Sequence, residues 1–271
     1  MIDVGRFHDY LMSLASSVTA MALEIRAKGL TENLKGEELV TEADGQVENF
    51  LIRKLSEEFP CLSFHGEEGG VTNQNASEWR VYIDPIDGTM IFAAGMDYFG
   101  ISVALAQNHE PVVGWIIFPD REVTISAIKG QGVCLGGERS MLSNASPISA
   151  KPLSECLVSC DYGIKGGARQ GVPDAIDRYF KPVARYVRYV VLRACFTWTA
   201  YEVILGKLDA YVHPGVGPYD LAAAILIAKE SGRAVGPIDP KGTIDLTQDV
   251  IPVIIARDEA TLVSLQEILR H

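Results

Sequence analysis

Apolar residues recur at helical spacing through the first sixty positions of the chain. The first stripe runs at intervals of four and three residues and consists of Phe7, Leu11, Leu14, Val18, Met21 and Ile25. It predicts one face of an amphipathic helix that ends near Gly29. A second stripe, through Val47, Leu51 and Leu55, predicts another helix. Pro60 is expected to end this helix, because proline cannot continue the backbone hydrogen bonding.

Short runs of β-branched and aromatic residues follow, with turn residues between them, and begin at Trp79, Gly100, Val112 and Val123. In the first run, the apolar side chains of Trp79, Val81 and Ile83 alternate with more polar ones, as they do in a strand. Strands that are joined by short turns predict an antiparallel sheet.

The pattern of predicted secondary structure changes around residues 142–152. Beyond this stretch, strand-like and helix-like pieces alternate up to a terminal helix, which predicts an α/β (or α+β) fold. We therefore predict an N-terminal α/β subdomain over residues 1–148 and a C-terminal α/β subdomain over residues 149–271. The glycine-rich residues 163–171 are expected to form a mobile loop.

The composition narrows the class of protein. Of the 271 residues, 48% are hydrophobic, which is enough for a large core. No apolar run approaches the roughly 18 residues that span a bilayer. Asp3, Arg6 and Asp9 interrupt the apolar core that a signal peptide needs, so we expect a cytoplasmic protein with no membrane partner. The net charge of -11 argues against nucleic acid as a partner, and an anionic substrate would need positive charge that metal ions can supply.

Carboxylates gather at the end of the run that begins at Trp79. Asp84 and Asp87 lie in D-P-I-D-G-T, and the other acidic candidates are Glu67, Glu68 and Asp220. A set of oxygen ligands without histidine or cysteine at ligand spacing favours magnesium or manganese. Pro85 fixes the turn so that the Ile86 carbonyl can point the same way as the two Asp side chains. The alternative is that Asp84 and Asp87 cap a turn and that Asp220 caps a helix.

Gly88 and Thr89 suggest a contact with an anion. Gly88 would let a bound phosphate approach the backbone, and a helix that begins near Thr89 would point free N–H groups at it. The Thr89 hydroxyl could also orient a water molecule and pass a proton to Asp44. Asp44 has an equally simple interpretation as the N-cap of the second predicted helix.

Taken together, four ordered motifs resemble the inositol monophosphatase family: V-T-E-A-D (40–44), G-E-E (66–68), D-P-I-D-G-T (84–89) and a late D-L-A-A-A (220–224). The resemblance implies a layered αβαβα sandwich with an N-terminal antiparallel sheet and a smaller C-terminal mixed sheet. It also implies lithium-sensitive hydrolysis of phosphate monoesters with two or three Mg²⁺ ions, with Mn²⁺ as the alternative ion, and a homodimer.

The resemblance also assigns roles to residues. The metal ligands by resemblance are Glu67, Asp84, the Ile86 carbonyl, Asp87 and Asp220, with Glu68 near a more weakly held ion. Asp44 and Thr89 match the pair that orients the attacking water, and with Glu67 they form the expected catalytic set. Gly88 and Thr89 are expected to bind the phosphate, and Lys35 only loosely matches a lysine that precedes the first motif.

By the resemblance, the residues that depart from the family pattern belong to the pocket for the alcohol part of the substrate. Ile91 replaces an asparagine, Tyr219 and Ala223 are substituted, and a G-[ST]-A stretch reads Ala194-Cys195-Phe196. His213 stands where the family has an acidic residue. Substrate contacts are therefore expected from Asp87, Ala194, Phe196 and His213.

These departures predict that inositol 1-phosphate is not the best substrate and that an aromatic phosphate, or one with a second anion, is preferred. Histidinol phosphate, fructose 1,6-bisphosphate and adenosine 3',5'-bisphosphate are the alternatives among enzyme substrates. A non-catalytic regulatory protein that keeps the fold is the alternative of another class.

Overall fold

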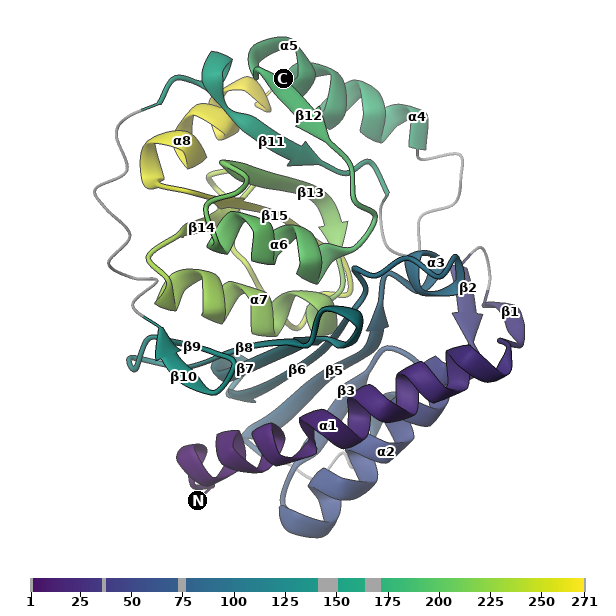
Figure 1. The fold of residues 1–271 in the computed structure, drawn as a ribbon. Helices are drawn as coiled ribbons and strands as arrows, with labels where there is room; N and C mark the ends of the chain where they lie inside the picture. The colour runs from purple at the N-terminus through teal and green to yellow at the C-terminus, as the bar shows by residue number, and fades with distance from the viewer. Residues whose placement is uncertain (1, 36–37, 73–76, 141–150, 164–171, 271) are drawn as a thin grey trace.

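The computed structural model describes residues 2–35, 38–72, 77–140, 151–163 and 172–270. In this part of the chain, helices and sheets alternate in five layers (Figure 1). The predicted junction at residues 142–152 lies almost entirely outside the described residues, as does most of the predicted loop at 163–171. The described helices include none that is long and apolar enough to cross a membrane.

The first layer consists of α1 (Val4–Lys28) and α2 (Glu42–Glu58), which confirms both predicted helices. Asp3 caps α1 by accepting from the Arg6 N–H, and Gly29 ends it with a φ of 92°. Leu11 and Leu51 are fully buried, because both helices pack one apolar face against the larger sheet. Before α2, a separate two-stranded ribbon is formed by β1 (Glu32–Lys35) and β2 (Glu38–Thr41).

The second layer is an eight-stranded sheet, counted over the described residues, with the order β10-β9-β8-β7-β6-β5-β3-β4. Its strands are β3 (Ser63–Gly66), β4 (Gly70–Thr72), β5 (Trp79–Asp87), β6 (Gly100–Gln107), β7 (Glu110–Phe118), β8 (Val123–Ile128), β9 (Val133–Leu135) and β10 (Glu138–Ser140). From β5 to β10 all neighbours are antiparallel, as predicted. β3, for which the sequence made no strand prediction, pairs in parallel with β5, because β4 first returns the chain along the sheet edge.

The fourth layer is a five-stranded sheet with the order β12-β11-β13-β15-β14 in the described chain. Its strands are β11 (Leu157–Cys160), β12 (Tyr189–Val191), β13 (Ala210–Val216), β14 (Ala234–Pro237) and β15 (Ile251–Ala256). The pairs around β11 are parallel and those around β15 are antiparallel, so the sheet is mixed, as expected.

Helices fill the remaining two layers. Between the sheets lie α6 (Phe196–Ile204) and α7 (Pro218–Glu230), and the outer face of the smaller sheet is covered by α8 (Glu259–Ile268) together with α4 (Val172–Ala175), the π-helical turn Ile176–Phe180 and α5 (Lys181–Tyr186) (Figure 1). The short α3 (Thr89–Ala93) follows β5. The fold is therefore the expected α/β sandwich of αβαβα layers.

Helix α7 is buried on all sides and joins the two halves of the molecule. Its run of small residues lets it approach the larger sheet closely: a Cβ added at Gly114 on β7 would stand 2.7 Å from the carbonyl oxygen of Ala223. One hydrophobic cluster contains Tyr82 and Ile116 from the larger sheet together with Leu221 of α7. This packing fixes the N-terminus of α7, where Asp220 lies, against the strands that carry the other acidic residues.

Candidate active site

A β-bulge at the end of β5 brings its two aspartates together. Residues three apart on a regular strand face opposite sides of a sheet. The register of β5 against β6 shifts between Asp84, which pairs with Ser102, and Asp87, which pairs with Gly100. Three residues of β5 therefore span two of β6, and Pro85 occupies the bulge, where a missing N–H is tolerated. Both carboxylates consequently line one cavity.

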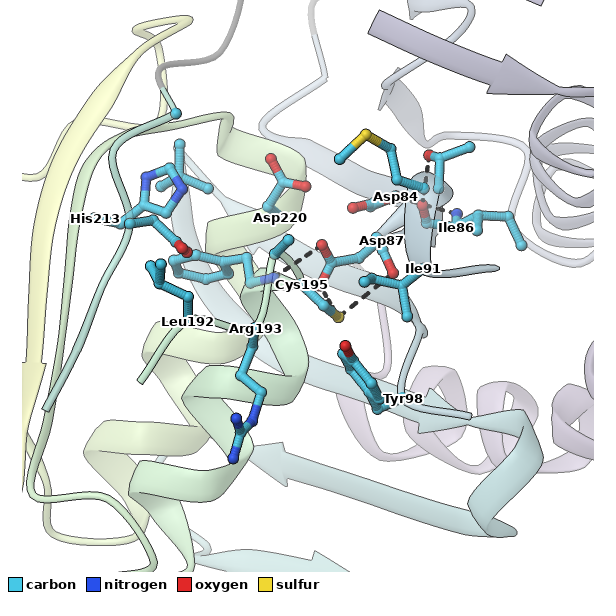
Figure 2. A pocket seen from close by; sticks show the side chains of 18 of the residues that line it. Asp84, Ile86, Asp87, Ile91, Tyr98, Leu192, Arg193, Cys195, His213 and Asp220 are labelled. Carbon is cyan, nitrogen blue, oxygen red and sulfur yellow. Dashed lines mark hydrogen bonds between the residues drawn. The ribbon is translucent and has the colours of Figure 1, made fainter. Parts of the chain in front are cut away.

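The cavity has a volume of about 610 Å³ and lies where β5, α6, α7 and the carboxyl ends of β11 and β13 meet. Figure 2 shows Asp220 of α7 facing Asp84 and Asp87 of β5. Carboxylate oxygens of Glu67, Asp84 and Asp220 lie within 4.8 Å of one another, and this acid cluster is the group of the described residues that could hold a metal ion. Asp87 adjoins the acid cluster, whereas Glu68 does not belong to it.

The acid cluster brings carboxylates close together, and those of Asp84 and Asp220 are buried. The Asp84 side chain is fully buried, and its Oδ2 accepts no hydrogen bond from the described residues. Burial, followed by the nearby Glu67, raises the pKa of Asp84 well above its usual range. Burial, followed by Asp220, raises the pKa of Asp87 to about 6. A cation among these oxygens would offset both the burial of the charges and their mutual repulsion, so the residues fit a metal site.

Asp84 and Asp220 each accept a hydrogen bond from a backbone N–H group. Asp84 Oδ1 accepts from the Ile86 N–H at 3.1 Å, and Asp220 Oδ2 accepts from the N–H of Gly217, the N-cap of α7, at 3.1 Å. The turn-capping and helix-capping interpretations of these residues are therefore correct as far as they go. The caps also fix the direction in which the remaining oxygens point, and so they orient the acid cluster.

Asp44 is not the N-cap of the second helix, which is the structural alternative that the sequence left open, but it does support that N-cap. Thr41 is the N-cap of α2, and Asp44, three residues later, completes a capping box by accepting from the Thr41 N–H at 2.8 Å through Oδ2. Its other oxygen, Oδ1, accepts from the Thr89 hydroxyl at 3.3 Å. Thr89 is the first residue of α3, as predicted, and Gly88 precedes it with a φ of 84°. Burial raises the pKa of Asp44, and the hydrogen bonds from Thr41 oppose this shift.

The N-terminus of α6 holds Asp87. The Phe196 N–H donates to Asp87 Oδ1 at 3.0 Å, while the N–H and hydroxyl of Thr197 donate to Oδ2. The Cys195 thiol also donates to Oδ2 at 3.2 Å. A side chain at position 88 would meet Cys195, since an added Cβ would stand 3.0 Å from the Cys195 Cβ. Gly88 is therefore needed for the close approach of α6 to β5.

Glu48 is a functional candidate that the sequence analysis missed. It lies on α2, is 3% exposed, and accepts from the backbone N–H of Glu68 at 2.9 Å and of Gly69 at 2.7 Å through its two carboxylate oxygens. An added Cβ at Gly66 or Gly69 would stand 2.3 Å and 2.8 Å, respectively, from this carboxylate. Glu48 thus holds the turn that presents Glu67. The glycines on both sides of E-E were the available signal, since they leave room for a buried side chain.

The wall opposite the acid cluster is built from two strand ends and the segment before α6. His213 of β13 lies on this wall (Figure 2), as does Asp161, which follows β11. Ala194 lines the cavity in the left-handed backbone region, with a φ of 55°, where the resemblance expects glycine. Phe196 also lines the cavity, but it is only 4% exposed and its ring packs against Tyr211. Lys35 has no described side chain.

The layered fold and the buried cluster of carboxylate oxygens define the class: an α/β enzyme with a site for metal ions. The family model for the inositol monophosphatase family matches residues 5–268. The chain belongs to this family and is a phosphoric monoester hydrolase. The family is metal-dependent and acts on small phosphorylated substrates.

Individual relatives agree with the family. An inositol monophosphatase of Dictyostelium discoideum is 31% identical over 209 residues, which cover 76% of this chain and 73% of that protein. A fructose-1,6-bisphosphatase/inositol-1-monophosphatase of Thermotoga maritima is 29% identical over 199 residues, which cover 73% of this chain and 71% of that protein. The crystal structure of the extragenic suppressor protein suhB from Bartonella henselae has the same fold, with a TM-score of 0.83 at 23% identity over 97% of both chains.

Proposed function

We propose that the protein is a Mg²⁺-dependent phosphomonoesterase, with Mn²⁺ as an alternative ion, that hydrolyses a small phosphorylated metabolite. The observation that carries this proposal is the grouping of the Glu67, Asp84 and Asp220 oxygens within 4.8 Å. Oxygen-only donor sets are those that Mg²⁺ prefers. When bound, two or three such ions would supply positive charge that lowers the pKa of water and offsets the charge of the phosphate.

The proposed ligands are Glu67, Asp84, the Ile86 carbonyl, Asp87 and Asp220, with Glu68 beside a more weakly held ion. Asp87 would also contact the alcohol part of the substrate, since its carboxylate lines the cavity and is held there by the N-terminus of α6. Thr89 would orient the attacking water, and Asp44 would accept the proton of the Thr89 hydroxyl. The contact between Thr89 and Asp44 at 3.3 Å supports this assignment.

The phosphate would lie against Gly88 and Thr89, where the backbone turns sharply after β5. Its alcohol part would contact Asp87, Ala194, Phe196 and His213, which line the same cavity. The ester bond would then lie between the acid cluster and the opposite wall, as in-line attack by an oriented water requires.

Phosphate release from a panel of phosphate esters tests the proposed activity. We expect hydrolysis in Mg²⁺ that stops when the metal is removed with EDTA and that lithium inhibits. A chain that binds Mg²⁺ but hydrolyses none of the esters would contradict the proposal and favour the non-catalytic regulatory protein.

The preferred ester is a separate part of the proposal. His213 and Phe196 replace residues that the family pattern expects, which supports a substrate other than inositol 1-phosphate. Comparing kcat/KM for inositol 1-phosphate, histidinol phosphate, fructose 1,6-bisphosphate and adenosine 3',5'-bisphosphate tests this. A clear preference for inositol 1-phosphate would contradict it.

A homodimer and a cytoplasmic location also belong to the proposal. The first rests on the family resemblance alone, and light scattering on the purified protein would test it. Fractionation of cells that make the protein would test the second.

A further inference from the structure

Asp161 and His213 are neighbours at the carboxyl ends of two parallel strands. β11 and β13 pair in register through Cys160 and Val212, and the Asp161 N–H donates to the Val212 carbonyl at 3.1 Å. The next residue on each strand is therefore Asp161 on one side and His213 on the other. Both line the cavity on the wall opposite the acid cluster.

A buried tyrosine orients the Asp161 carboxylate. The Tyr211 hydroxyl donates to Asp161 Oδ2 at 2.5 Å, and Tyr211 is 1% exposed. Burial, followed by the charge of Asp161, raises the pKa of Tyr211 well above its usual range, so the hydroxyl remains a donor. The other oxygen, Oδ1, accepts no hydrogen bond from the described residues. Asp161 therefore offers the cavity an acceptor whose direction is fixed by the core.

The His213 ring lies beside this acceptor. The Gly215 N–H donates to His213 Nδ1 at 3.2 Å, so Nδ1 is the acceptor in this bond. The imidazole packs edge-on against Phe196, with ring centroids 5.6 Å apart and an interplanar angle of 79°. This packing holds the ring in one orientation at the cavity wall.

The positive charge on this wall is already paired. Arg193 Nε donates to Glu202 Oε2 of α6 at 3.0 Å, and the guanidinium points away from the acid cluster (Figure 2). Among the described residues of the wall, the charge without an ionic partner is that of Asp161. A second anion on a substrate would be repelled there, whereas a hydroxyl or an ammonium group would be attracted.

We propose that the Asp161 carboxylate, held by Tyr211 at the end of β11, is a specificity-determining group that contacts the alcohol part of the substrate. It makes the enzyme selective for phosphate monoesters whose alcohol part carries a hydrogen-bond donor, either hydroxyl or ammonium. This inference rests on the proposed phosphomonoesterase activity, and it favours donor-bearing alcohols over esters with a second phosphate.

The test compares esters that differ only in their donors. Inositol 1-phosphate is paired with cyclohexyl phosphate, and 2-aminoethyl phosphate with ethyl phosphate, so that the hydroxyl and ammonium arms are separate. We expect Asp161→Asn to lower kcat/KM by about 10- to 100-fold for at least one donor-bearing ester, the usual scale for a hydrogen bond to a charged group. Its partner without donors should change less than about twofold, because both react at the same acid cluster.

A purely structural role would give a different result. If Asp161 only held Tyr211 in place, Asp161→Asn would slow both members of each pair equally, and that outcome would overturn the inference. An unchanged kcat/KM for all four esters would overturn it as well. Asp174→Asn, at an exposed position on α4, is the matched control. A parent protein that hydrolyses none of the esters in Mg²⁺ contradicts the proposed function, whereas one that hydrolyses paired esters equally contradicts only this inference.

Discussion

The Thr89 hydroxyl donates a hydrogen bond to Asp44 Oδ1 across 3.3 Å, and this contact joins the start of α3 to the first turn of α2. The same hydroxyl lies 3.2 Å from the Ile86 carbonyl oxygen. A hydroxyl between a buried carboxylate and a proposed ligand oxygen is well placed to orient a water molecule.

Thr89→Ala should therefore lower kcat by about 10²-fold or more, the scale for losing one positioned catalytic group. The Mg²⁺ concentration needed for half-maximal rate should change little, because the acid cluster is intact. Steady-state kinetics at several Mg²⁺ concentrations measure both values, and Thr89→Ser, which keeps the hydroxyl, is the control. A variant in which only KM rises would show that Thr89 binds phosphate without orienting water.

Asp87→Asn should reduce turnover by about 10³-fold or more, since a lost ligand charge removes several kcal/mol of stabilisation in the transition state. The fold should persist. The lost charge relieves repulsion from Asp220, although one N–H of α6 then faces an amide nitrogen in place of a carboxylate oxygen. Phosphate release and thermal unfolding in EDTA measure the two effects. A parental rate in saturating Mg²⁺ would show that Asp87 is not a ligand.

Glu48→Gln tests whether the turn before β4 must be held for metal binding. The amide can accept from only one of the N–H groups of Glu68 and Gly69, so the turn that carries Glu67 should loosen. We expect the Mg²⁺ concentration for half-maximal rate to rise about 10-fold, the scale reported for residues that support a metal ligand. The KM for substrate at saturating Mg²⁺ should stay near the parental value.

The matched control for this variant is Glu57→Gln, which changes an exposed residue of the same helix. Equal loss of stability in both variants, with no change in Mg²⁺ dependence, would reduce Glu48 to a structural residue.

The stability of the metal-free protein should depend on pH through the acid cluster. The folded pKa of Asp87, about 6, lies above that of an unfolded aspartate, about 3.9. A raised folded pKa means that the folded protein binds more protons, so the stabilisation is complete below about pH 4 and is lost as the pH rises through about 6. Asp84 shifts in the same direction.

Thermal unfolding at pH 5 and pH 7.5, with EDTA or with Mg²⁺, measures this dependence. We expect Mg²⁺ to raise Tm by several degrees more at pH 7.5 than at pH 5, because the ion must compete with protons at the lower pH. In Asp87→Asn the difference between the two pH values should shrink. A Mg²⁺ effect that is equal at both pH values would contradict the assignment of these carboxylates as a coupled cation site.

The sequence predicts those parts of the site that lie within one motif. Asp84 and Asp87 are three residues apart beside a proline, so a turn and a shared face can be inferred from spacing. The helix stripes are predictable for the same reason, since their periodicity is local. Spacing alone does not predict the β-bulge between Asp84 and Asp87 that makes the two carboxylates converge.

Contacts between distant segments were not predictable. In the sequence, Glu48 looks like an ordinary polar residue of a helix. Its role in holding the turn that carries Glu67 depends on hydrogen bonds from backbone N–H groups about twenty residues later. Asp161 and His213 are brought together only by the register of β11 against β13. The parallel pairing of β3 with β5 was missed for the same reason, because the short β4 carries little periodicity of its own.

The acid cluster takes its three carboxylates from β3–β4, β5 and α7, segments that are far apart along the chain. A partly folded chain in which α7 has not docked against Gly114 would lack Asp220 and would present an incomplete set of ligands. Divalent cations should therefore select the fully assembled molecule and shift the equilibrium toward it by mass action. Metal binding would then stabilise only the correctly assembled protein. Cells depleted of magnesium should accumulate less of this protein, in addition to any loss of its catalytic activity.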